Sequence, residues 1–526
     1  MLTVVKKKAD RKVHPKGEQE MRVARVGNEG TTVDTYGGMI HVKWDEEASV
    51  TPYGQMPFFI NFLKTAGLWE AFVEDCPLAY TSANAPSKSD ILGTILLAVL
   101  AGHRRYSHIT ALRFDGVIPK LLGMSKVCSE DSVRRAFAGI KEPECEQWLK
   151  KHLRTSYEPL LSEPWILDID ATVKPLYGHQ EGAVKGYNPG KPGRPSHAYH
   201  TYFAANIRLV LDVEVQAGNQ TATSFAQPEL WKFLGSLPTQ AKPSMIRGDC
   251  AWGTDRMMAE AEEQEIPYLF KLKQTSNVKH LIQRLFSSED WTSAGQGWMG
   301  VEAELKLSGW ARSRRVIVLR RRIRDELVLE QQKQLASSTT GLQMSLGFIE
   351  MGKNKVLHEY AVLVTSLSAE ILELAQHYRD RADAENNFDE LKNQWGWSGF
   401  TTCDLHRCQI MARIIGLIYN WWSLFTRLAI PGKHAEAITS RPLLLNAVGK
   451  QTKHGGQTTV TVSSMHAKAP TIHLVLNSIN SFLATIRDGA EQLTYPQKWR
   501  LILTRIFSHI LKGRPLNHTQ SIPQHG

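Results

Sequence analysis

The feature that most constrains the fold of this chain is a change of hydrophobic period at Pro164. Between Pro57 and about Tyr157 the apolar residues recur with the spacing of helices, whereas Trp165–Thr172 alternates apolar and polar positions as a strand does. The following segments predict, in order, a hairpin at 200–218, a strand at 245–249, a helix at 254–264 and a strand at 267–273. This order predicts a mixed α/β core.

The flanking regions differ from this core in composition. We expect a basic N-terminal arm at 1–56, a helical region at 57–160, a core at 161–273 and 358–428, a β-rich insertion at 274–357, and a helical C-terminal region at 429–526. Two helices at 117–124 and 129–140 resemble a helix-turn-helix that exposes Arg134 and Arg135; a plain helical bundle is the alternative.

Charge favours a polyanionic partner. The 63 Lys and Arg exceed the 52 Asp and Glu, for a net charge of +11, and basic residues cluster at 1–27, at 312–324 and after Glu491. The longest apolar run, Ile91–Gly102, is short for a membrane span. The six cysteines include no C-x-x-C pair, and Cys403, His406 and Cys408 match no zinc-finger spacing. We therefore expect an intracellular protein without structural zinc.

The most informative segment for chemistry is 377–397. On a continuous helix, Tyr378, Arg381, Glu385 and Lys392 fall within an arc of about 60°. An aromatic ring, two cations and a carboxylate do not make a core face. Asp389 shares the stripe and is the rival carboxylate.

Carboxylates also occur at two strand positions of the predicted core. Asp168 and Asp170 share one face of the first strand, and Asp249 ends a later strand. Cleaving a phosphodiester with two Mg²⁺ ions requires about three carboxylates, which supply the oxygen ligands that Mg²⁺ prefers. Asp170, Asp249 and Glu385 are suitably dispersed, although an Asp at a strand end can equally be a cap or turn residue.

These residues carry a resemblance to a known family. The spacing Tyr378-x2-Arg381-x3-Glu385-x6-Lys392, preceded by Asp170-x-Thr172 and by Asp249, resembles the DDE transposases of bacterial insertion sequences, in the branch with a Tyr-Arg-Glu-Lys signature. The resemblance covers about 160–425. For the flanks it implies only that the helical region at 57–160 binds DNA ends and that the region at 429–526 has a possible role in dimerisation. It implies an RNase H-like catalytic core in which Asp170, Asp249 and Glu385 bind two Mg²⁺ ions, with Mn²⁺ able to substitute.

The resemblance also implies sites for DNA. Tyr378, Arg381 and Lys392 would hold phosphates near the cut, and an aromatic residue of the insertion would receive a flipped base during hairpin formation. Trp298 is the candidate, followed by Trp291 and Trp310, with a place in the insertion core as the alternative. Only Asp170 has the x-Thr that the family pattern expects, so Asp168 is left as a second ligand or a supporting residue. The basic loop between the first two strands could contact DNA through Lys185, Lys191 and Arg194.

The hypothesis from sequence is a bacterial, cytoplasmic DNA transposase that associates with the nucleoid when bound to DNA. It would bind the terminal inverted repeats of its own element as a homodimer on paired ends, cleave them and join the 3′ ends to target DNA. The rivals are a stand-alone RNase H-like nuclease and a domesticated, inactive DNA-binding descendant.

Overall fold

A computed structural model describes residues 30–80, 82, 84–221, 225–322, 358–432, 434–489 and 492–516, without the side chains of 383 and 384. It divides into two compact units, Met1–Ala48 and Ser49–Gly526. In the first unit, β1 (Thr31–Thr35) and β2 (Gly38–Val42) form an antiparallel hairpin with exposed side chains. Residues 1–29 of the predicted basic arm lie outside the described residues.

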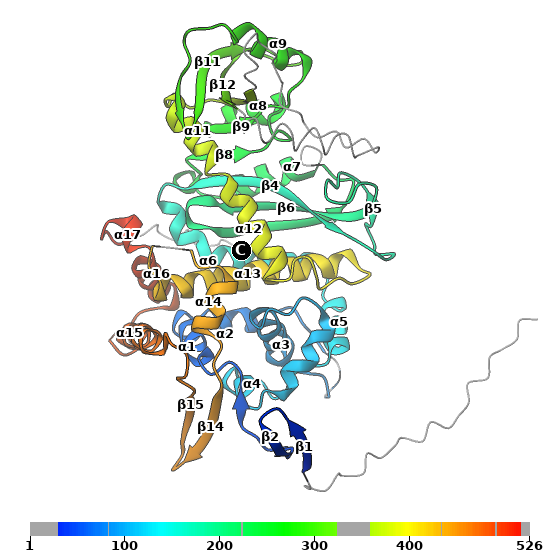
Figure 1. Ribbon diagram of the computed structural model, residues 1–526, viewed down its shortest axis with the longest axis vertical. Helices are drawn as coiled ribbons and strands as arrows, with labels where there is room; N and C mark the ends of the chain where they lie inside the picture. The colour runs from blue at the N-terminus through cyan, green and yellow to red at the C-terminus, as the bar shows by residue number, and fades with distance from the viewer. Residues whose placement is uncertain are drawn as a thin grey trace, which may run out of the picture. The chain divides into compact units, whose positions relative to one another are not determined.

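The second unit is built on one large mixed sheet (Figure 1). The strand order is β10-β11-β12-β13-β9-β8-β4-β6-β5, with β7 paired to β6. The strands are β4 (Ile166–Pro175), β5 (Val184–Lys185), β6 (Pro195–Ala204), β7 (Leu209–Ala217), β8 (Met245–Gly248), β9 (Tyr268–Lys271), β10 (Thr292–Gly295), β11 (Trp298–Leu305), β12 (Arg314–Arg322) and β13 (His358–Thr365).

The centre of this sheet has the arrangement that the sequence predicts. Strands β4, β6 and β7 are antiparallel, and β8 and β9 continue from β4 in parallel. The helices α7 (Gln227–Gly235) and α8 (Asp255–Glu263) supply the connections to β8 and β9. The α/β prediction is confirmed, and the strand arrangement is consistent with an RNase H-like core.

The predicted insertion extends the same sheet. Its described part opens with a helix, α9 (Ser276–Leu285), where strands were predicted. Val278, Leu281 and Ile282 bury one side of α9 at helical spacing. The strands β10, β11 and β12 then add to β13 by antiparallel pairing. Residues 323–357 lie outside the described part of the chain.

The free edge of β7 is covered by the long helix α13 (Leu405–Ala429). The Gln409 side chain accepts from the Val215 N–H and donates to the Val213 carbonyl, and Asn420 pairs in the same way with both backbone groups of Val210. These amides satisfy strand groups that would otherwise be buried without partners. The helix therefore closes this edge and fixes the core against the helical regions.

Helices precede and follow the core. Before it come α1 (Met56–Ala66), α2 (Leu68–Glu74), α3 (Lys88–Leu100), α4 (Ile118–Leu121), α5 (Glu130–Ala138) and α6 (Glu142–Tyr157), and after β13 come α11 (Ile371–Arg379) and α12 (Ala382–Asn393). Short 3₁₀ turns occupy Tyr106–Phe114, Glu158–Ser162, Ala205–Ile207 and Thr239–Ala241. Because α4 is a single turn, the predicted pair of helices at 117–124 and 129–140 is present only in its second member.

The C-terminal region is less helical than predicted. It contains α14 (Ala437–Leu444), α15 (Ala469–Asp488), α16 (Tyr495–Ile506) and α17 (Ser508–Leu511). Within the region expected to be helical, the chain forms a hairpin of β14 (Gly449–His454) and β15 (Gln457–Val462), which pairs with β3 (Val50–Thr51). No described helix is long and apolar enough to cross a membrane.

The buried His200 on β6, next to β4, is expected to make the free energy of unfolding depend on pH. His200 of β6 is 1% exposed, and burial lowers its pKa to about 4 from an ordinary value of 6.5. Between these two pH values His200 binds a proton in the unfolded chain but not in the folded chain. The free energy of unfolding therefore falls as pH drops through this window. At pH 5 the loss from His200 is about 2 kcal/mol.

Urea unfolding at pH 7.5 and pH 5 tests this expectation. His200→Phe, which places a ring beside Phe225, should remove about 2 kcal/mol of the acid-induced loss. His473→Phe, at an exposed position on α15, is the matched control and should leave the loss unchanged. An equal loss in His200→Phe and in the unmodified chain would contradict the expectation.

Candidate active site

The register of two parallel strands brings Asp170 and Asp249 together. Asp168 of β4 is paired with Arg247 of β8, and Ile169 with Gly248, so the next step along both strands is Asp170 beside Asp249. Asp249 follows the last residue of β8, and its Oδ1 accepts from the Ala251 N–H at 2.9 Å. The two carboxylates therefore meet at the carboxyl end of β8.

The environment of Asp170 is buried and charged. Burial and the nearby Asp249 raise the pKa of Asp170 to about 6, although Arg381 acts in the opposite direction. The Arg381 Nη2 donates to Asp170 Oδ2 at 2.5 Å, and both side chains are nearly buried. Arg381 is thus the cation that balances the carboxylate pair in this structure.

Arg381 reaches Asp170 because the helix is interrupted. The sequence predicts one continuous helix over 377–397, but α11 ends at Arg379 and α12 begins at Ala382. The prediction of a single stripe from Tyr378 to Lys392 is therefore wrong at this point. Tyr378 belongs to α11, where burial raises the pKa of its hydroxyl to about 12 despite Arg381. That hydroxyl stays protonated at neutral pH and can donate a hydrogen bond.

On α12 the predicted stripe survives. Arg381, Glu385 and Lys392 lie within about 40° of one another around the helix axis, with Arg381 at its N-cap. Lys392 is half-buried; burial lowers its pKa, while Asp389 and Asp170 raise it. Glu385 is exposed and lies between two cations that both interact with Asp170.

Asp168, the alternative ligand on β4, and Glu390 of α12 both have structural partners. Asp168 forms a buried bidentate ion pair with Arg247, at 2.6 and 2.8 Å, and this removes it as a free ligand. The sequence signal was a charged residue, Arg247, inside an otherwise apolar strand. Glu390 is 2% exposed and bonds His434 at 2.6 Å and Trp395 at 3.0 Å. Asp389 remains exposed and accepts from Asn393 at 2.6 Å.

The donor chemistry of this site fits a divalent cation. Asp170 and Asp249 offer only carboxylate oxygens, and their mutual repulsion, which raises the pKa of Asp170, is the electrostatic state that a hard cation relieves. Among the described residues, however, no three His, Cys, Asp or Glu side chains are grouped closely enough to hold a metal ion. The Asp pair fits as it stands, whereas Glu385 does not join it in this arrangement.

The three tryptophans of the insertion differ in exposure. Trp291 and Trp310 are buried, and their rings are covered by Arg320 at 3.8 Å and Arg314 at 5.3 Å. Trp298 on β11 is half-buried beneath Arg321. Trp298 and Tyr378 pack against the same small core cluster, which includes residues of α11. The insertion thus brings one accessible indole to the helix that ends beside Asp170.

The other predicted DNA contacts lie on separate elements. Lys185 is exposed on β5. Lys191 and Arg194 both lie over the exposed ring of Tyr177, at 4.9 and 4.8 Å, an aromatic partner that the sequence prediction missed.

Helix α5 carries the remaining two predicted contacts. Arg135 is exposed, whereas Arg134 is half-buried over Tyr106 and pairs with Glu130 at 3.8 Å. Arg134 therefore has a packing role that Arg135 lacks.

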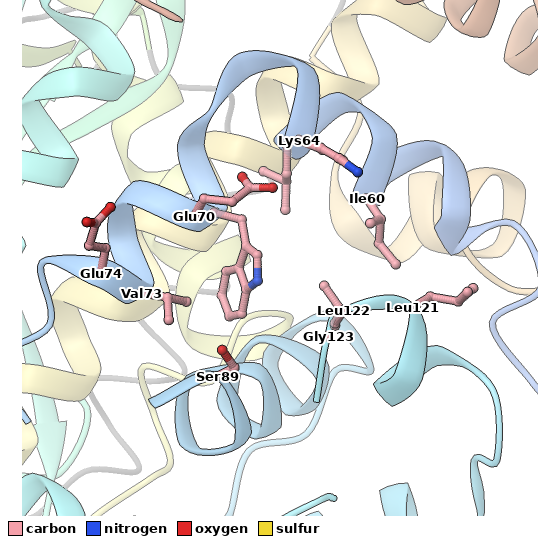
Figure 2. A pocket seen from close by; sticks show the side chains of 11 residues that line it. Ile60, Lys64, Glu70, Val73, Glu74, Ser89, Leu121, Leu122 and Gly123 are labelled. Carbon is pink, nitrogen blue, oxygen red and sulfur yellow. The ribbon is translucent and has the colours of Figure 1, made fainter. Parts of the chain in front are cut away.

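A cavity of about 460 Å³ opens between α1, α2, α3 and α4. Figure 2 shows Ile60, Val73 and Leu122 lining it, with the carboxylates of Glu70 and Glu74 one turn apart on α2. None of the predicted site residues lines this cavity. Its mainly apolar wall does not resemble a site for phosphodiester chemistry.

The structure thus places Asp170 and Asp249 on adjacent parallel strands, with Arg381 and Lys392 as the nearby cations. The chain matches the family Transposase DDE domain group 1 over residues 78–483, and it therefore belongs to this family of DDE transposases. A cryo-EM structure of a piggyBac transposase synaptic complex with hairpin DNA is similar, with 10% identity, 90% of this chain and 87% of that chain covered, and a TM-score of 0.38. No curated protein matches the chain significantly.

Proposed function

We propose that this chain is a metal-dependent DNA transposase that binds the terminal inverted repeats of its own element, cleaves the DNA ends and joins the 3′ ends to target DNA. The observation that carries this proposal is the half-buried pair of Asp170 and Asp249, with Arg381 and Lys392 nearby, in a chain of the DDE transposase family. Transfer at a phosphodiester requires carboxylates that bind the metal ions and cationic side chains that bind the phosphates.

We assign Asp170, Asp249 and Glu385 as the residues that hold two Mg²⁺ ions, with Mn²⁺ as a substitute. When bound, the ions stabilise the attacking and the leaving oxygen. In this arrangement Glu385 is exposed on α12 and is not grouped with the Asp pair, so holding the ions with all three carboxylates would require the Glu385 side chain to move toward the pair.

The cations of α12 bind the DNA backbone in this proposal. Arg381 offers a forked donor and Lys392 a point charge to phosphates beside the cut. The Tyr378 hydroxyl donates to a third phosphate oxygen. Lys185, Lys191, Arg194, Arg134 and Arg135 contribute further contacts along the DNA, Arg134 less than Arg135 because its side chain already packs on Tyr106.

We further place the chain in the branch of bacterial insertion-sequence transposases with a Tyr-Arg-Glu-Lys signature, active as a homodimer on paired ends and located with the bacterial nucleoid. The signature residues Tyr378, Arg381, Glu385 and Lys392 support this placement. The insertion of this branch would supply the indole that receives a flipped base.

Trp298→Ala is expected to separate two steps of the reaction. An unstacked base gains about 1 to 3 kcal/mol by stacking on an aromatic ring, so losing the indole should slow hairpin formation roughly tenfold or more. The first nick should remain near normal because no base is flipped at that step. Denaturing gels that resolve nicked from hairpin product make the comparison.

Trp291→Phe, at a buried ring, is the matched control for folding of the insertion. If Trp298→Ala slows nicking and hairpin formation equally, the indole serves packing and the assignment to a flipped base is wrong.

Cleavage of the gene's own flanking DNA tests the proposed function. A duplex that contains the inverted repeat and its flank should be cut at the repeat boundary in the presence of Mg²⁺, and a duplex with a scrambled repeat should not. Binding without cutting would favour the inactive descendant, and cutting without regard to the boundary would favour the stand-alone nuclease.

A further inference from the structure

The C-terminal region carries a two-stranded ribbon, formed by β14 (Gly449–His454) and β15 (Gln457–Val462) and joined by the Gly455–Gly456 turn (Figure 1). Its base is fixed: Gly449 and Lys450 pair with β3, and Val460 packs against the main core. Beyond Gln451 the backbone of β14 is paired only with β15 among the described strands. The ribbon is therefore anchored at one end and free at the other.

One face of the ribbon is entirely polar. The register pairs Lys450 with Thr461, Thr452 with Thr459, and His454 with Gln457, and cross-strand partners point to the same side. All six side chains are exposed. Exposed polar side chains add little stability by burial, and an isolated hairpin is only marginally stable in water. A face of this composition is suited to hydrogen bonding with a polar partner.

The chain segment that carries the ribbon has charges of one sign. No Asp or Glu occurs between Glu436 and Asp488, whereas Lys450, Lys453 and Lys468 lie within that stretch and are exposed. In the described part of the chain, neither Lys450 nor Lys453 forms an ion pair. Unpaired lysines on a surface without carboxylates attract phosphates and release counterions when they bind them.

We propose that the β14–β15 ribbon is a second DNA-binding element, which lies in a groove of duplex DNA outside the active site. This inference rests on the proposed function. The strands extend for about 20 Å, and a two-stranded ribbon fits the major groove of about 12 Å width. Lys450, on the polar face, and the long side chain of Lys453, on the opposite face beside Thr458, bind backbone phosphates. The hydroxyl, amide and imidazole groups of the polar face contact base edges and sugars.

A second copy of this chain is the competing occupant. Val448 and Met465, both highly exposed, flank the base of the ribbon and would suit a protein partner. The free part of the ribbon nevertheless presents lysines and threonines, and two copies of such a surface would repel each other. The charge therefore favours DNA over a second copy.

Fluorescence anisotropy with a labelled duplex of random sequence, without metal and over a series of salt concentrations, tests the proposal. Lys450→Ala combined with Lys453→Ala should weaken binding at ~0.1 M salt by roughly tenfold or more, and should reduce the log-log salt slope by about 2. Lys232→Ala, an exposed lysine paired with Glu229 on α7, is the matched control and should change affinity less than about twofold.

A shortened ribbon provides an independent test that leaves the charge of the base intact. Deleting Lys453, His454, Gln457 and Thr458 lets the Gly455–Gly456 turn close on Thr452 and Thr459, which keeps the strand register. This variant should also lose affinity, while its thermal unfolding midpoint stays within a few degrees of the unmodified chain.

Reduced DNA affinity and a reduced salt slope in both variants support the proposal. Unchanged DNA affinity and salt slope overturn it. If the affinity is unchanged but light scattering shows that the dimer is lost, the ribbon contacts a second copy of the chain and the proposal is also overturned. If the unmodified chain itself fails to bind duplex DNA, the proposed function fails, and the ribbon assignment fails with it.

Discussion

Asp170→Asn and Asp249→Asn are each expected to reduce DNA cleavage by at least about a thousandfold, because each change removes an anionic ligand from a site that requires several to hold its cations. Binding of end DNA without metal should stay within about threefold. Asp170→Asn weakens the ion pair with Arg381 but relieves the repulsion between Asp170 and Asp249, so we expect the folded state to be retained.

Cleavage of an end-labelled duplex and anisotropy without metal measure the two quantities separately. Glu263→Gln, an exposed carboxylate on α8, is the matched control and should cut at the normal rate. An Asp249→Asn protein that retains most of its cleavage would exclude the paired aspartates as the catalytic centre.

Three carboxylates on α12 are expected to respond in three different ways. Glu385→Gln should abolish cleavage, again by about a thousandfold or more, with unchanged stability, because Glu385 is exposed and lies on the stripe that faces Asp170. Glu390→Gln should lower the free energy of unfolding by about 2 to 3 kcal/mol, because it weakens buried, charged hydrogen bonds to His434 and Trp395. Asp389→Asn should change neither.

Urea unfolding and cleavage rates on the same three preparations test this pattern. The decisive comparison is between Glu385→Gln and Asp389→Asn, which share exposure and helix. If the Asp389 variant loses cleavage and the Glu385 variant cuts normally, Asp389 is the third carboxylate and the assignment of Glu385 is wrong.

The catalytic strands could be predicted because their signals are local. Alternation over Trp165–Thr172 located β4, and an apolar strand ending in an acidic residue located β8. The proximity of Asp170 and Asp249 depends on the parallel pairing of β4 with β8, and the β6–β7 hairpin and α7 separate these strands in the chain, so the local patterns do not specify it. The ion pair between Asp168 and Arg247 depends on register between distant segments, and local patterns do not specify register.

Two features were missed for different physical reasons. The break between α11 and α12 falls at Asp380 and Arg381, where the long-range ion pair of Arg381 with Asp170 leaves no signal in the local sequence. The β14–β15 ribbon had a local signal, a Gly-Gly turn between Thr-rich segments, which the helical surroundings outweighed in the prediction.

Strand transfer from a pre-cut end tests the central claim most directly. A duplex that ends at the repeat boundary with a free 3′-OH, incubated with Mg²⁺ and a supercoiled plasmid, should become covalently joined to the plasmid, and Asp170→Asn should abolish joining. Joined product that depends on Asp170 is the result we expect from a DDE transposase. Efficient cleavage of intact ends without any joining would contradict it and would identify a nuclease.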